Sequence, residues 1–128
     1  MEYYFSKTIT ESFDNALQKV KDALQTQGLG VLTEIDMKAT LKKKLDVDFH
    51  NYTILGACNP PFAYKALLAE DKIGTMLPCN VVIQEKNPGQ VEIAAVDPFA
   101  SMLAIENKSL QEIATEIGAR LKKVIELV

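Results

Sequence analysis

Two kinds of segment alternate along this chain, and their order constrains the fold more than any other feature. Some are rich in aromatic and β-branched residues, which favours strands, and others carry apolar residues at helical spacing. Strands are predicted at 3–9, 31–36, 50–57, 80–85 and 91–96, and helices follow residues 12, 59 and 109, with a short helix at 37–45. The predicted order is β-α-β-(α)-β-α-β-β-α, which favours an α+β fold. We expect one mainly antiparallel sheet with helices packed mainly on one face, in a single domain over residues 1–128.

Short polar signals set the predicted ends of these elements. Asn59 can cap a helix whose first residue is Pro60, where the missing N–H of proline costs nothing. Ser109 and Glu112 have the spacing of a capping box and predict the start of the last helix. Asp97-Pro98 is expected to form a simple turn that ends the fifth strand.

Composition excludes several classes of function. The chain of 128 residues has a net charge of −3, and its 14 basic residues include a single arginine, Arg120. Arginine is the favoured residue for phosphate and guanine contacts, so we expect no nucleic-acid partner. No apolar run approaches the ~18 residues of a membrane helix, and no signal peptide is predicted. We expect a cytoplasmic protein with reduced cysteines and no membrane partner.

A Cys-Asn pair occurs twice, each time at a boundary between predicted elements. Cys58-Asn59 joins a strand to a helix, and Cys79-Asn80 begins a strand. A thiol in front of a helix N-terminus can have a lowered pKa, so Cys58 is the candidate nucleophile. A purely structural interpretation is also open: both cysteines would be small buried apolar residues, and Asn59 would serve only as a cap.

The sequence predicts no metal site and no cofactor. His50 is the only histidine, and it begins the strand that Cys58 ends. Eight residues of strand span about 26 Å, so one metal ion cannot take both side chains unless the strand ends early. The 20 residues between the two cysteines match neither a redox nor a zinc-binding spacing.

Several segments together resemble the bacterial and archaeal "domain of unknown function 302" family. They are Ile54–Pro61, Ile73-Gly74, Leu77–Val82 and Val96–Pro98, and the likeness extends over nearly the whole chain. The resemblance implies a small α+β domain that forms dimers. It implies no established reaction, cofactor or substrate.

We therefore expect a homodimeric module that binds a small molecule at Cys58, Asn59, Cys79 and Asn80. The helix N-terminus would favour an anionic or carbonyl-bearing ligand. One alternative is thiol chemistry, in a redox or stress sensor or an enzyme that uses Cys58 as its nucleophile. A second alternative is an interaction protein without a ligand site. The sequence does not decide whether the chain is an enzyme.

Overall fold

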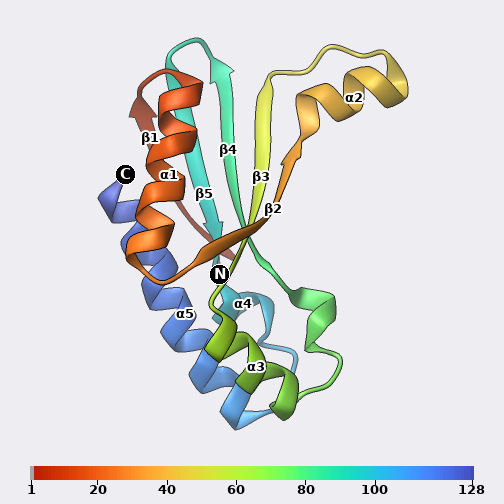
Figure 1. The fold of residues 1–128 in the computed structure, drawn as a ribbon, viewed down its shortest axis with the longest axis vertical. Helices are drawn as coiled ribbons and strands as arrows, with labels where there is room; N and C mark the ends of the chain where they lie inside the picture. The colour runs from red at the N-terminus through yellow and green to blue at the C-terminus, as the bar shows by residue number, and fades with distance from the viewer. Residues whose placement is uncertain (1) are drawn as a thin grey trace.

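The structure is a computed structural model that describes residues 2–128, shown as a ribbon in Figure 1. Its elements in chain order are β1 (Tyr4–Thr10), α1 (Phe13–Thr26), β2 (Gly30–Asp36), α2 (Met37–Leu45), β3 (Asn51–Cys58), α3 (Pro60–Ala69), the 3-10 helix η1 (Ile73–Met76), β4 (Cys79–Asn87), β5 (Gln90–Val96), α4 (Pro98–Ser101) and α5 (Lys108–Leu127). The predicted strands and helices are all present, and η1 and α4 are additions.

The five strands form one sheet in the order β1-β5-β4-β3-β2. Every pair of neighbouring strands is antiparallel, as predicted. A tight turn joins β4 to β5, and Gly89 occupies it with φ of 79°, a conformation that glycine adopts without steric cost. The two edges of the sheet are therefore β1 and β2.

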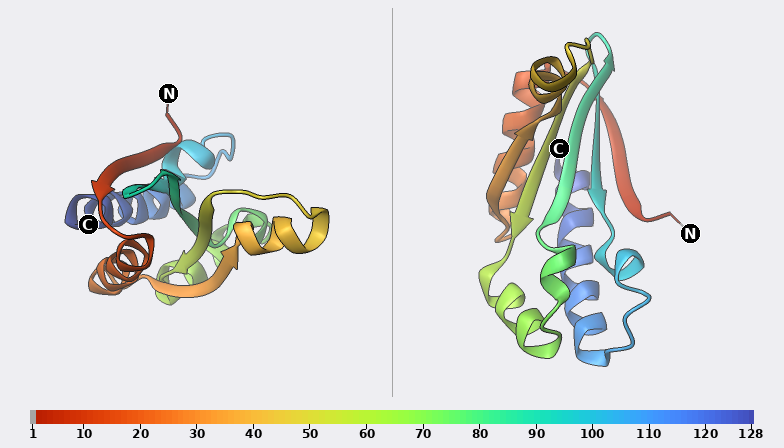
Figure 2. Two further views of the ribbon diagram at one scale, coloured as in Figure 1. Left: turned by 90° about the horizontal axis from the view of Figure 1, so that it is seen from above. Right: turned by 90° about the vertical axis from the view of Figure 1, so that its right-hand side faces the viewer.

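The main core lies between one face of this sheet and the helices α1 and α5. Alternate residues of the three central strands point into it, as the two-residue period of a strand requires. They include Leu55, Val81, Ile83, Val91 and Ile93, which are fully buried. Figure 2 shows the two helices on the same side of the sheet.

The long helix α5 contributes to two cores. Its second half carries Leu121 and Val124 into the main core against the sheet. Its first half extends past the end of the sheet and packs beside α3, as Figure 1 shows. There Leu110 and Ala114 join Ile73 in a second, smaller core, which α3, η1 and α4 complete.

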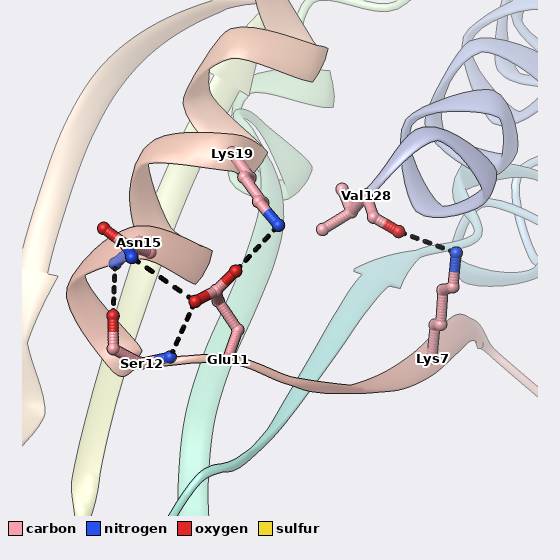
Figure 3. A network of polar contacts seen from close by, with 6 residues as sticks. All are labelled: Lys7, Glu11, Ser12, Asn15, Lys19 and Val128. Atoms are coloured by element: carbon pink, nitrogen blue, oxygen red, sulfur yellow. Dashed lines mark hydrogen bonds and ion pairs between the residues drawn. The ribbon is translucent and has the colours of Figure 1, made fainter.

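Polar contacts fix the start of α1 over the sheet. Ser12 caps the helix by accepting a hydrogen bond from the backbone N–H of Asn15. The Glu11 carboxylate accepts from Lys19 Nζ at 2.8 Å and from Asn15 Nδ2 at 3.3 Å (Figure 3). These bonds lower the pKa of Glu11 from 4.5 to about 2, the bond from Lys19 being the largest cause.

A separate contact connects β1 to the C-terminal end of the chain: Lys7 Nζ donates to the Val128 carbonyl at 2.7 Å.

One part of the molecule projects from the rest. We call Gly30–His50 the arm: it comprises the edge strand β2, α2 and the loop to β3, and its α2 and loop project away from the helical layer in Figure 1. All seven residues of β2 are exposed, and α2 has no buried residue. The arm therefore contributes almost nothing to either core.

Two local predictions differ from the structure. Asn107, not Ser109, caps α5: its side chain accepts from the backbone N–H of Leu110 at 3.2 Å and donates to the Ala69 carbonyl at 2.9 Å. The cap is fixed by a contact with the end of α3, which sequence spacing does not reveal. Asp97 caps the short helix α4 and does not form a simple turn.

Gly56 in β3 should be indispensable, because a side chain there has no room. A Cβ atom at this position would collide with Thr33 Oγ1 on β2 and would lie 2.5 Å from Pro78 Cγ. We expect Gly56→Ala to lower the free energy of unfolding by about 1–3 kcal/mol, as overpacked sites do. Gly74→Ala is the matched control, because a Cβ atom there would meet nothing within 4 Å. Urea denaturation measures both, and equal stability of the two variants would contradict the close packing at Gly56.

Candidate functional site

The two Cys-Asn motifs meet at one corner of the sheet. β3 ends where β4 begins, and in this antiparallel pair Ala57 lies opposite Cys79. Cys58 follows Ala57, so the thiols come from directly neighbouring positions. Both side chains line a single small cavity of about 40 Å³.

This cavity lies at the junction of the two cores. Its other walls come from residues of the main core, among them Leu29, Ala57 and Ile117, and from residues of the second core, among them Ala66, Met102 and Ala114. The cavity is almost entirely apolar, because nearly all of these residues are aliphatic. Cys79 is buried and Cys58 is half-buried at its wall.

Asn59 caps α3, as predicted, and both ends of its side-chain amide are hydrogen-bonded. Its Oδ1 accepts from the backbone N–H of Phe62 at 3.1 Å, and its Nδ2 donates to the Gly28 carbonyl at 3.0 Å. The second bond connects the start of α3 to the end of α1. Asn59 therefore holds the corner together, and as a residue of the cavity lining it keeps one N–H group and one oxygen lone pair beyond these two bonds.

The first turn of α3 lacks the free N–H groups on which the predicted anionic or carbonyl-bearing ligand depended. Pro60 and Pro61 have no N–H, the N–H of Phe62 is taken by the Asn59 side chain, and the N–H of Ala63 is taken by the Asn59 carbonyl at 2.9 Å. An anion binds at a helix N-terminus through free N–H groups. The first turn of α3 offers none.

Asn80 lies apart from the other three residues of the motifs. Successive side chains of a strand point to opposite faces, so Cys79 faces the helices while Asn80 is exposed on the other face of the sheet. Asn80 lines two shallow hollows outside the Cys58–Cys79 cavity. The structure thus brings Cys58, Asn59 and Cys79 together and leaves Asn80 outside.

The Cys58 thiol is less acidic than the sequence predicted. Burial raises the pKa of Cys58, opposite to the lowering expected at a helix N-terminus. Burial and the charge of Cys58 raise the pKa of Cys79 from 9.0 to about 11. Both groups are protonated thiols at neutral pH, because the cavity is apolar and the helix end has no free N–H group.

Three residues of this corner were not predicted. Met102, at the end of α4, is buried and lines the cavity. Phe62 also lines it, and the Arg120 guanidinium lies 5.1 Å from the centre of the Phe62 ring. Arg120 Nη1 donates to the Gln27 carbonyl at 3.0 Å. No sequence signal identifies Met102, because it lies in a segment that was expected to be irregular.

His50 lies at the far end of β3 from Cys58, as predicted. Its Nε2 is 3.0 Å from Gln84 Oε1 on the neighbouring strand. Within residues 2–128, no group of three or more histidine, cysteine, aspartate or glutamate side chains is arranged to hold a metal ion. No helix of the same residues is both long and apolar enough to cross a membrane.

The fold and this corner define a class: a small α+β protein with one antiparallel sheet, helices on one face and a cysteine-lined cavity at the end of the sheet. The chain belongs to the family described as "Domain of unknown function DUF302", whose model matches residues 5–128. This match confirms the family predicted from the sequence.

A solved structure is similar to the whole chain. The crystal structure of an uncharacterized conserved protein DUF302 from Bacillus stearothermophilus has a TM-score of 0.90 and 25% sequence identity over 98% of each chain. A comparison with curated proteins finds no match. The α+β fold is therefore confirmed, and neither comparison assigns an activity.

The two asparagines should differ sharply in their effect on stability. Asn59→Ala removes both the cap of α3 and the bond to the Gly28 carbonyl, so we expect a loss of about 2 kcal/mol in the free energy of unfolding. Asn80→Ala changes an exposed position and should cost less than about 0.5 kcal/mol. Thermal and urea unfolding of both variants provide the test. Similar losses would contradict the different roles assigned to them.

Proposed function

We propose that this protein is a homodimeric binding module whose ligand occupies the cavity between Cys58 and Cys79. The observation that carries the proposal is the meeting of both cysteines of the chain at the junction of its two cores. The site retains Cys58, Asn59 and Cys79 of the predicted set and omits Asn80. Asn59 holds the wall, and both cysteines belong to the lining.

The size and lining of the cavity support a binding role. A cavity costs about 24 cal/mol per Å³, so a space of about 40 Å³ weakens the fold by about 1 kcal/mol if it stays empty. Several alanines line it, including Ala63, Ala66 and Ala114, where one larger side chain would fill the space. Binding a ligand would recover the lost contacts.

The same features limit the ligand to a few atoms. Sites for drug-sized molecules have volumes of roughly 300–1,000 Å³, far above the 40 Å³ found here. The blocked helix end and apolar walls disfavour an anion. A neutral or soft ligand of one to three atoms suits the space best.

Thiolate catalysis is less well supported than binding. The thiolate is the reactive form of cysteine, and burial raises the pKa of both thiols above the ordinary value. Within the cavity lining, no basic side chain is present to remove the proton from either thiol.

Native mass spectrometry of protein purified under reducing conditions tests the ligand site. We expect a bound mass on the wild type that is absent from Ala114→Leu, which fills the cavity, and from Cys79→Val, which removes a sulfur at nearly constant volume. Xenon, a single-atom apolar guest, should bind wild-type protein from which any other ligand has been removed, and it should not bind Ala114→Leu. A wild type that carries no ligand and admits no xenon would contradict the proposal.

The arm supports the dimeric half of the proposal. Leu32, Ile35 and Leu45 are 64%, 45% and 66% exposed, and Phe49 near its end is 39% exposed. β2 is an edge strand, so its outer N–H and C=O groups have no partner strand. A nine-residue helix that buries nothing is only marginally stable alone, so the arm needs a covering surface.

A second copy of the chain is the partner that best fits this surface. α2 carries Lys38, Lys42, Lys43 and Lys44 and no acidic residue, whereas the whole chain has a net charge of −3. Glu34, Asp36, Asp46 and Asp48 of the arm match these four lysines, and Lys42 is paired with Asp46 and Asp48. The arm is therefore neutral overall, so two arms can meet without net repulsion. Antiparallel pairing of β2 with the β2 of a second copy about a two-fold axis would join the two sheets and satisfy both edges.

Light scattering during size-exclusion chromatography tests this dimer. We expect a wild-type dimer and a monomeric Leu32→Glu, because the charge would be buried at the joined edge. Leu68→Glu is the matched control, because Leu68 is 70% exposed on α3, outside the arm. A monomeric wild type, or a dimer broken only by Leu68→Glu, would contradict the arm as the interface.

A further inference from the structure

Sulfur is concentrated at one end of the sheet. Cys58, Cys79 and Met102 all line the cavity described above. Met76 joins Cys79 and Met102 in lining an adjacent open hollow of about 310 Å³. The chain has two cysteines and four methionines in all, so both cysteines and half of the methionines gather here.

These four residues come from separate parts of the chain. Cys58 ends β3, Met76 ends η1, Cys79 begins β4 and Met102 follows α4. Only the packing of α3, η1 and α4 beneath the sheet brings them to one place (Figure 1). The cluster is thus a property of the tertiary structure, which adds two methionines to the cysteines of the Cys-Asn motifs.

Sulfur is also the most frequent metal-ligating atom among the side chains that line the cavity. Besides the three sulfur-bearing side chains, Asn59 is the one polar side chain in the lining, and both ends of its amide are already hydrogen-bonded. No histidine or carboxylate lines this space. Three of the four side chains in the lining that could hold a guest by a directed bond therefore carry sulfur.

We propose that the guest is a single copper(I) ion, bound by the sulfur atoms of Cys58 and Cys79 and the thioether of Met102. This inference rests on the proposed function and names its ligand class. Soft thiolate and thioether ligands select copper(I) among biological metal ions, and a single ion suits a space of about 40 Å³. Zinc(II) prefers four nitrogen, sulfur or oxygen ligands, and the lining does not offer that set.

The binding step is a simple exchange of protons for metal. The ion displaces one proton from each thiol, two thiolate–copper bonds form, and the oxidation state does not change. Burial penalises the free thiolates at this site, and the positive ion would remove that penalty. The resulting centre carries one negative charge. Arg120, whose guanidinium lies 5.1 Å from the centre of the Phe62 ring at the cavity wall, is the nearest recorded cation, and it is already paired with Glu116 at 3.3 Å.

The open hollow provides the route of access. Cys79 and Met102 line both the hollow and the cavity, so they separate the two spaces. Met76 on the outer side is 40% exposed. A thioether at the surface could receive the ion from a small thiol complex and pass it inward to Met102 and Cys79.

Anaerobic titration with copper(I) against a chromogenic chelator tests this site. We expect one ion per chain and the release of two protons, with three-sulfur coordination in the X-ray absorption spectrum. Met102→Leu, which keeps an apolar side chain of similar size, should weaken binding by about tenfold or more. Cys58→Ser and Cys79→Ser should weaken it by about a hundredfold or more.

Control variants distinguish binding at this site from a general affinity of copper(I) for sulfur. Met37→Leu, in the arm, should leave the affinity unchanged, because Met37 lines neither space. Thermal unfolding checks that each variant is folded, and Cys79→Val replaces Cys79→Ser if the latter is not. Binding that is unaffected by Met102→Leu, or by loss of either cysteine, would overturn the assignment.

The outcomes also distinguish this inference from the proposed function. If the wild type carries an organic adduct or admits xenon but does not bind copper(I), the inference fails and the binding function stands. If it binds copper(I) with the expected dependence on all three residues, both stand. If it binds neither copper(I) nor any other guest, both fail.

Discussion

The position of α5 relative to the sheet determines most of this structure. Only the second half of the helix packs on the strands, where Leu121 and Val124 enter the main core. The first half extends past the sheet, so its apolar residues Leu110 and Ala114 need other partners. They find them in α3, η1 and α4, which form the second core. Where two cores meet on one helix, the packing is not continuous, and the cavity lies at that junction.

The ends of β3 and β4 give this junction its chemistry. Their pairing sets Ala57 opposite Cys79 and so places both cysteines beside the cavity. Asn59 then connects the end of β3 to the end of α1 through a hydrogen bond. Because Gly56 has no side chain, Pro78 can approach it closely. The ends of these elements, joined by hydrogen bonds and close packing, thus form a frame around the apolar cavity and its cysteines. Such a site favours binding of a very small guest over thiolate catalysis, because the frame supplies neither a base nor free N–H groups at the helix end.

The sequence predicted much of this fold because the signals involved are local. The strands, the short helix at 37–45, the Asn59 cap and the hairpin all follow from alternation, helical spacing and turn chemistry. The cap of α5 was misplaced because the choice of Asn107 over Ser109 depends on a hydrogen bond to Ala69, 38 residues away. The helix α4 was missed because four residues carry too little periodicity to be recognised.

The sequence by itself determined the α+β class, the family and the placing of the two Cys-Asn motifs at element boundaries, because these depend on residue order. Only the tertiary structure decided which motif residues share a site. The two-residue period of β4 sends Cys79 and Asn80 to opposite faces, so the second motif is divided. The packing of α3, α4 and α5 against the sheet sets the size of the cavity and the burial of the thiols, and it places Met102 in the cavity wall. Packing brings together residues that are distant in the chain, and no local sequence pattern predicts which of them will be in contact.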